Sequence, residues 1–340
     1  MKILKKPLLF IAMSAMLGFT SCSDDDDDDV TDDIVEMDSA MLYATTHSGS
    51  VVQYNLDDGT SYTVNTSSTD AEGIFYDEDD SSLIVASRDP KQLQYYGDVD
   101  MWDGSMSTVS AEFMSSSDLM SPRDVAVNGD LIVVADNADV DGDDTTADGR
   151  FYIYSKEDNG FTLRNTVTVD FKVWGIEFVG NTLYAIVDTT NMLASFDNFL
   201  SNNTDGMVSA TKTVMVEGIV RTHGLDYDGG TMVLTDIGDA GSDSDGGLHV
   251  ITDFDSKFNN TMDASTLALS DQMRISGAAT LLGNPVNVAY DADSDMIYVA
   301  ELANGGGRVL AFDDASNASG NATPAVNNML SGVSAVYFED

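Results

Sequence analysis

The sequence predicts an all-β fold, a six-bladed β-propeller with four antiparallel strands in each blade. The first observation is a repeat, in which a short apolar strand, a tight polar turn and a second apolar strand follow one another. The repeats begin at residues 73, 124, 175, 224, 287 and 335, so successive starts lie 51, 51, 49, 63 and 48 residues apart. The second observation is that the last repeat stops after its first strand. Its missing strands stand near the other end of the sequence, at 41–46, 50–55 and 61–64, so both termini would close the last blade and leave no exposed edge.

The turns and strands inside each repeat support this assignment. Asn128-Gly129 and Gly180-Asn181 are pairs that favour two-residue hairpin turns. The strands are rich in Val, Ile, Tyr and Phe, and apolar residues at helical spacing are almost absent. A seventh blade would need a degenerate hairpin within 254–283, which lacks the repeated pattern, so six blades is the prediction. Third strands follow variable loops, at 93–96, 151–155, 192–197, 248–252 and 309–313.

The first 21 residues are predicted to be a signal peptide that precedes the one cysteine of the chain. Three lysines come before an apolar stretch, residues 8–19, that is too short to span a bilayer. The segment Phe19-Thr20-Ser21-Cys22 resembles a bacterial lipoprotein signal. This resemblance implies cleavage before Cys22 and attachment of a lipid to its thiol. The alternative is an ordinary secretory signal followed by an unrelated cysteine.

An acidic run follows the cysteine at once. Six consecutive aspartates occupy 24–29, and like charges at this density keep a segment extended and solvated. Residues 22–39 are therefore predicted to be a tether, and 40–340 the propeller. The Cys-Ser-(Asp)n pattern also resembles the export signal of surface lipoproteins in Bacteroidetes. It implies a lipid anchor in the outer membrane with the ring facing the medium, and a periplasm-facing anchor is the alternative.

The composition excludes several classes of protein. The chain carries 58 Asp and Glu against 15 Lys and Arg, a formal net charge of −43, so nucleic-acid phosphates would be repelled. A single cysteine excludes a disulfide scaffold and a zinc site built from cysteines. The hydrophobic share of 43% is enough for a packed core, so the chain is not predicted to be disordered throughout.

The blade pattern over residues 40–340 resembles the NHL-repeat and gluconolactonase (senescence marker protein) group of six-bladed propellers. In such propellers the residue before each first strand and the acid that ends each second strand lie near one mouth of the channel. A ring of acids with one His, one Arg and one Trp suits a small polar ligand. The alternative is structural, with the acids accepting hydrogen bonds from loop amides and the tryptophan filling the channel. The resemblance implies a rim that includes Arg123, Trp174, Asp136, Asp188 and Glu301, together with Glu72, His223 and Asp236.

The gluconolactonase resemblance also implies a divalent-metal site. Glu72-Gly73 matches an early Glu-Gly motif of that group, and His223-Gly224 stands where the group has Asn-Gly before a leucine. Asp236 would be a further ligand, and His223 would act as general base towards a metal-activated water. The sequence departs from the group in having His223 in place of asparagine, and Ile74 in place of a proline.

The loop at 136–150 is a second candidate for a cation. Asp139, Asp141 and Asp143 alternate with other residues around a glycine, and Ca²⁺ needs carboxylates that converge around a tight turn. The spacing does not fit the full EF-hand pattern, which ends in a glutamate. The expected cofactor is therefore Ca²⁺ or another divalent cation, and the alternative is a solvated acidic loop.

These observations favour a non-enzymatic, surface-anchored binding module. Its expected partner is a glycan, an envelope protein or a small molecule. The alternative is a metal-dependent lactonase or esterase with its site at the channel mouth, and a third reading is a purely structural envelope role. No complete catalytic motif stands in the sequence, and a propeller fold by itself selects none of these functions.

Overall fold

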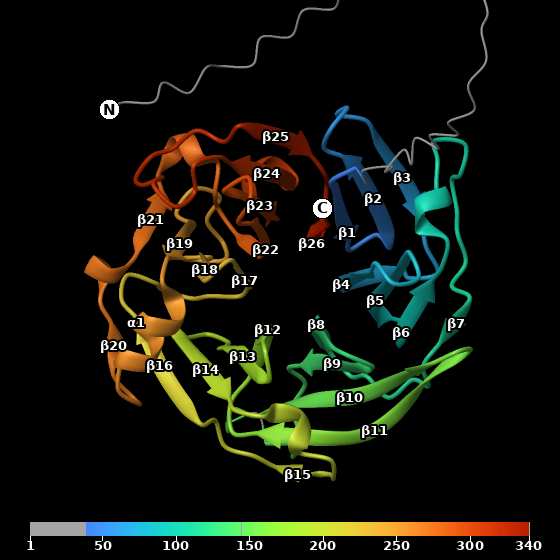
Figure 1. Cartoon of the computed structure of the whole chain (residues 1–340), viewed down its shortest axis with the longest axis horizontal. Helices are drawn as coiled ribbons and strands as arrows, with labels where there is room; N and C mark the ends of the chain where they lie inside the picture. Colours follow the sequence, from blue (N-terminus) through green and yellow to red (C-terminus); the bar gives the residue numbers. More distant parts are fainter. Residues whose placement is uncertain (1–38, 144, 340) are drawn as a thin grey trace, which may run out of the picture. The chain divides into compact units, whose positions relative to one another are not determined.

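Six β-sheets are arranged as the blades of a ring around a central channel (Figure 1). The structure is a computed structural model, and it describes residues 39–143 and 145–339. The six sheets confirm the predicted six-bladed β-propeller. The predicted signal peptide, Cys22 and all but the last residue of the predicted tether lie outside the described residues.

In every blade the first strand lies at the channel, and the following strands succeed one another towards the outside of the ring (Figure 1). Blade 1 consists of β4 (Asp70–Asp77), β5 (Ser82–Asp89), β6 (Lys91–Tyr96) and β7 (Phe113–Met114). Blade 2 contains β8 (Pro122–Asn128), β9 (Leu131–Asp136), β10 (Gly149–Glu157) and β11 (Gly160–Val169). Blade 3 contains β12 (Val173–Val179), β13 (Thr182–Val187), β14 (Met192–Phe196) and β16 (Lys212–Val216). Blade 4 consists of β17 (Leu225–Asp228), β18 (Thr231–Asp236), β19 (Gly247–Ile251) and β21 (Met273–Ser276), and blade 5 of β22 (Pro285–Asp291), β23 (Met296–Glu301), β24 (Arg308–Phe312) and β25 (Val326–Met329).

Blade 6 combines the two ends of the ring, as the sequence predicts. Its inner strand β26 (Val333–Glu339) pairs antiparallel with β1 (Met41–Thr46), and Tyr337 stands opposite Tyr43. The sheet continues with β2 (Ser50–Asn55) and β3 (Ser61–Asn65). The hydrogen bonds between β26 and β1 thus join segments almost 300 residues apart and close the ring.

Two blades carry a fifth strand, where the sequence predicts four. β15 (Gly206–Met207) follows β14 in the chain but pairs in parallel with β11 of the preceding blade. β20 (Thr266–Leu267) likewise reaches back from blade 4 to β16 of blade 3. Single bridges at Thr108 and Gly320 do the same for blades 1 and 5. Long connections between third and fourth strands therefore strap each of these blades to the one before it.

The junction between blades 1 and 2 is held by side chains, because the connection from β10 to β11 is a tight turn. The rings of Phe113 and Phe161 lie 5.1 Å apart across it. Lys156 Nζ of blade 2 contacts Asp77 Oδ2 and Asp80 Oδ2 of blade 1 at 2.6 and 2.7 Å. Aromatic packing and a two-carboxylate ion pair thus take the place of the strap.

The segment 254–283 does not form a seventh blade. It begins with the one α-helix of the described residues, α1 (Phe254–Asn260), whose Phe254 and Phe258 pack edge-on against Tyr184 of blade 3. The rest of the segment supplies β20 and β21, so its apolar residues serve blades 3 and 4. The described residues also form short 3₁₀ turns, η1 (Val99–Met101), η2 (Phe199–Ser201), η3 (Leu269–Asp271), η4 (Ala278–Thr280) and η5 (Asn304–Gly306).

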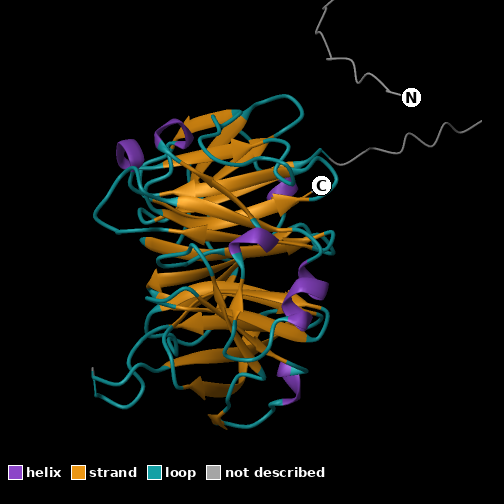
Figure 2. Ribbon diagram, turned by 90° about the vertical axis from the view of Figure 1, so that its left-hand side faces the viewer, coloured by secondary structure: helices purple, strands orange, loops and turns teal. Residues whose placement is uncertain are grey.

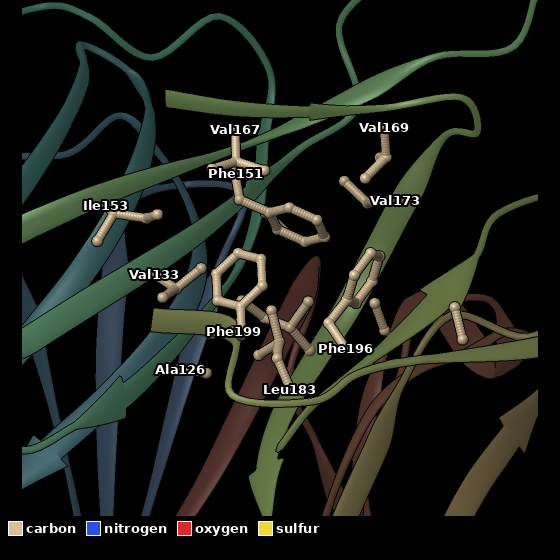
Figure 3. Close-up of a cluster of buried hydrophobic side chains, with 14 of the residues drawn as sticks. Ala126, Val133, Phe151, Ile153, Val167, Val169, Val173, Leu183, Phe196 and Phe199 are labelled. Carbon is tan, nitrogen blue, oxygen red and sulfur yellow. The ribbon is translucent and has the colours of Figure 1, made fainter. Parts of the chain in front are cut away.

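The hydrophobic core is divided into clusters that lie between neighbouring blades. In β13, Leu183 and Ala185 pack towards blade 2, whereas Tyr184 and Ile186 pack towards blade 4. Successive side chains of a strand point to opposite faces of its sheet, and both faces are covered here, so the middle of each second strand is a run of apolar residues. Figure 3 shows the cluster between blades 2 and 3, where Phe151, Phe196 and Phe199 meet. Each fully buried aromatic or aliphatic side chain contributes about 1.5–3 kcal/mol.

The inner strands approach one another closely around the channel. A Cβ at Gly73 would lie 2.6 Å from the backbone of Asp124, and one at Gly224 would lie 2.7 Å from the backbone of Asn287. At the same repeat position in two other inner strands, a polar side chain bonds to the next blade. Asp124 Oδ2 accepts from the Ile176 amide at 2.9 Å, and Asn287 Oδ1 accepts from the Val336 amide at 3.0 Å. Small residues and acceptor side chains thus set the width of the channel.

Candidate functional site

The channel has two chemically different ends, because all inner strands run in the same direction. The loop end is where the inner strands begin, beside the loops 137–148 and 237–246 that connect second and third strands. The hairpin end is where each inner strand turns back into the second strand. The strands run across the thickness of the ring from one end to the other (Figure 2). The rim residues predicted from the sequence belong to the loop end.

Glu72 is buried at the loop end and is held by two arginines. Its Oε1 accepts from Arg88 Nη1 at 3.2 Å and from Arg123 Nη1 at 3.1 Å. Burial raises the pKa of Glu72 above its ordinary value, while the nearby Arg123 acts in the opposite direction. An arginine pair of this kind neutralises the carboxylate and competes with any metal ion for it.

Arg123, Trp174 and His223 form a stack around the loop end. The Arg123 guanidinium carbon lies 4.1 Å from the centroid of the Trp174 ring. The His223 ring stacks on the same indole, with centroids 3.6 Å apart and planes 3° from parallel. The two groups come from the blades on either side of blade 3, and both contact the half-buried indole. Trp174 therefore packs through its ring against side chains of both neighbouring blades.

His223 is buried, with 4% of its surface exposed, and lies beside Asp188. Its Nε2 is 3.3 Å from Asp188 Oδ1, outside hydrogen-bond geometry, and neither ring nitrogen has a hydrogen-bond partner among the described residues. Asp188 Oδ1 accepts from Arg221 Nη2 at 3.0 Å. Burial lowers the pKa of His223 below its ordinary value, although the neighbouring Asp188 acts in the opposite direction. Burial alone would raise the pKa of Asp188, but the neighbouring His223 and Arg221 hold it below its ordinary value.

The other predicted rim acids accept hydrogen bonds from loops that precede the inner strands and from loops that follow the second strands. Asp136 accepts from the amides of Met120, Ser121 and Ala138. Asp236 accepts from the amides of Val220, Arg221 and Gly238, and from Arg274 Nη2 at 3.1 Å. Glu301 accepts from the amides of Gly283, Asn284, Ala303 and Asn304. These contacts match the structural alternative, in which an acid at a strand end satisfies loop amides.

The structure does not bring the predicted metal set of Glu72, His223 and Asp236 together. Among the described residues, the one group of three potential ligands whose atoms lie within 4.8 Å of one another is Asp139, Asp141 and Asp148. Glu72 and Asp236 are each paired with arginine. The general-base role of His223 needs a bound water or substrate beside a free ring nitrogen, and the stack on Trp174 leaves the imidazole little freedom.

The acidic loop 137–148 brings together part of the predicted cation site. Asp139 Oδ1 has no hydrogen-bond partner among the described residues, and Asp148 Oδ1 accepts from the Val140 amide at 2.9 Å. Asp143 lies outside the group, where its carboxylate accepts from the amide and hydroxyl of Thr145. These bonds to Thr145 lower the pKa of Asp143. Asp148 therefore replaces Asp143 in the geometry that a cation could use.

The hairpin end opens into a cavity of about 460 Å³ in the middle of the ring. All six inner strands line it, and none of the lining residues is basic. Burial raises the pKa of Asp124 and that of Asp226 to about 7 each. Burial and the two nearby aspartates raise the pKa of Glu177 well above its ordinary value. The carboxylates in the lining are Asp124, Glu177, Asp226, Asp228, Asp291, Asp293 and Glu339.

Sequence reasoning missed this acidic cavity, although a signal for it exists. Glu177 and Asp226 each interrupt an otherwise apolar inner strand, in Ile-Glu-Phe and Leu-Asp-Tyr. Successive side chains of a strand point to opposite faces of its sheet. An acid within an inner strand is therefore expected either in the channel or between two blades. Arg88 and Arg221, which pair with Glu72 and Asp188 at the loop end, were also missed.

Comparisons with known proteins agree on the fold only. No protein-family model and no curated protein matches the sequence. One chain of a crystal structure of a nidogen/laminin complex is similar in structure, with a TM-score of 0.57 and 12% identity, over 88% of this chain and 98% of that one. A computationally designed protein, Ika8, covers 88% of this chain and 75% of its own at 9% identity, but its TM-score of 0.41 supports no argument. At these identities the resemblance shows the β-propeller fold alone. No helix in the described part of the chain is long and apolar enough to cross a membrane.

Proposed function

We propose that this protein is a non-enzymatic binding module, a β-propeller anchored by a lipid on Cys22 in the outer membrane and exposed at the cell surface. The observation that carries the proposal is the cavity at the hairpin end, where six inner strands converge on a polar recess. Glu72 and Asp236, the metal ligands that the hydrolase alternative needs, are instead held in ion pairs with arginines. The similar chain from a nidogen/laminin complex supports a role in binding a protein partner.

The anchor and the binding role can be tested on intact cells. In a chain with Cys22→Ser we expect the protein to leave the membrane fraction, because its thiol is the proposed lipid attachment site. Crosslinking on intact cells should join the wild-type ring repeatedly to one surface component. The same crosslink should persist in Glu72→Ala, because binding does not depend on a metal at Glu72. Hydrolysis of a lactone or ester panel that disappears in Glu72→Ala would instead support the metal-dependent hydrolase.

We also propose that the loop 137–148 holds a divalent cation, with Ca²⁺ as the first candidate, through Asp139, Asp141 and Asp148. The group of converging oxygens supports it, since Ca²⁺ is bound by carboxylate oxygens. At a hundredfold excess over the dissociation constant, a cation that binds only the folded state adds about 2.7 kcal/mol of stability. Thermal melts in EDTA and then in Ca²⁺ should show this shift in the wild type and lose it in Asp139→Asn. Asp143→Asn is the matched control, and a wild-type melt unmoved by Ca²⁺ would leave the loop without a cation.

A further inference from the structure

The ion pairs of the ring are gathered at its loop end, which leaves the hairpin end with little neutralisation. Among the described residues eight of ten ion pairs lie at the loop end, and they involve Arg88, Arg123, Arg221 and Arg274 as well as three histidines. The two pairs at the hairpin end both use Lys156. In these ion pairs, Lys156 is therefore the one basic side chain that neutralises carboxylates of the hairpin end.

The central cavity continues into two further cavities, one over blades 1 and 2 and one over blades 1 and 6. One, of about 540 Å³, shares Phe75, Tyr337 and Glu339 with the central cavity. The other has a volume of about 560 Å³, and it shares Tyr76 and Glu78 with the 540 Å³ cavity. We call the joint lining of these three cavities the hairpin-end groove. Its basic side chain, Lys156, is already held between Asp77 and Asp80.

The groove combines fixed aromatic rings with acidic side chains, one of which is the exposed Glu78. Tyr76 stacks on the buried Tyr43, with centroids 5.0 Å apart, and Phe75 meets Tyr337 edge-on at 5.2 Å. These rings are half-buried and held by their neighbours, so binding would cost little side-chain entropy. Glu78 is exposed beside them, and its carboxylate makes no hydrogen bond or ion pair with the described residues.

We infer that the hairpin-end groove binds a basic peptide segment of a protein partner, with arginine or lysine side chains over the aromatic rings and against the acidic residues of the groove. Cations are attracted both to aromatic faces and to carboxylates, and a guanidinium can use the two at once. A bare metal ion would engage the carboxylates but leave the rings unused. This inference rests on the proposed binding role and specifies the partner chemistry.

The test uses a short labelled peptide that carries several arginines, with a second peptide in which citrulline replaces each arginine. Citrulline keeps the shape of the side chain and removes its charge. Fluorescence anisotropy with the full chain at moderate salt should show saturable binding of the arginine peptide only. In the double variant Glu78→Gln, Asp79→Asn we expect binding to weaken roughly three- to tenfold. Tyr76→Leu, which keeps every charge, should also weaken it.

The matched control is the double variant Asp313→Asn, Asp314→Asn, which removes two neighbouring exposed carboxylates at the same end of the ring but outside the groove. Binding by this control should stay within about twofold of the wild type, apart from the general loss of negative field. If peptide binding weakens equally in both double variants, the cause is the overall negative charge and not the groove, and the inference is overturned. Equal binding of the citrulline peptide, or binding of Ca²⁺ with no binding of the arginine peptide, would overturn it as well. If the crosslink on intact cells is observed but neither peptide binds, the protein still has a surface partner, but the inference that this partner is basic is wrong.

Discussion

Replacing Gly73 by alanine should destabilise the ring by about 2 kcal/mol. The added Cβ would stand 2.6 Å from Asp124 Cα, 2.7 Å from the Val125 nitrogen and 2.8 Å from the Asp124 carbonyl carbon. All three are backbone atoms of the neighbouring inner strand, so no side-chain rotation can make room for the methyl group. Overpacking a rigid site typically costs 1–3 kcal/mol, and the gain of about 0.4–1 kcal/mol from a stiffer unfolded chain offsets only part of this.

The matched control for this prediction is Gly160→Ala. A Cβ at Gly160 would meet nothing within 4 Å, and this glycine is not in the left-handed region. We expect its melting temperature to stay close to that of the wild type, while Gly73→Ala melts several degrees lower. Gly224→Ala should behave like Gly73→Ala, because its Cβ would approach the Asn287 backbone at 2.7 Å. A Gly73 variant that melts with the wild type would show that the inner strands can separate without cost.

The architecture could be predicted from the sequence because it depends on repetition. Six hairpins at regular spacing determine the number of blades, and the missing strands after Ala335 determine which ends must pair. The fifth strands could not be predicted, because β15 and β20 are only two residues long. Two residues carry no periodic pattern, and their pairing depends on where a long connection passes the preceding blade.

The positions of the rim residues could be predicted better than their roles. Repeat alignment placed Asp136 and Glu301 at equivalent strand ends, and the structure has them there. What each carboxylate binds depends on loop amides up to 18 residues away in the chain, which no spacing rule describes. The same limit applies to Glu72, because its partner Arg123 stands 51 residues further on in the next blade.

The acidic cavity carries the second large effect, a stability that falls as pH rises. The pKa of Asp226 is about 7 in the folded ring, against an ordinary value of 3.8, and burial is the main cause. Between about pH 4 and pH 7 the folded state therefore holds a proton that the unfolded chain has lost. Stability is greatest below this window and decreases through it as the buried carboxyl ionises near Glu177. The wild type should be more stable at pH 5 than at pH 8.

Asp226→Asn should remove part of this loss and raise stability at pH 8 by on the order of 1–2 kcal/mol. The amide oxygen can still accept from the Tyr290 amide, as Asp226 Oδ2 does at 2.5 Å, and the neutral side chain no longer repels Glu177. Urea unfolding at pH 5 and pH 8 measures the change. Asp158→Asn removes one charge from an exposed position and is the control for net charge. If both variants respond alike, the whole-molecule field and not the cavity causes the pH dependence. If only Asp226→Asn changes the pH dependence of stability, repulsion between carboxylates in the channel causes the loss at neutral pH. A bound cationic group would then stabilise the ring by reducing the same repulsion.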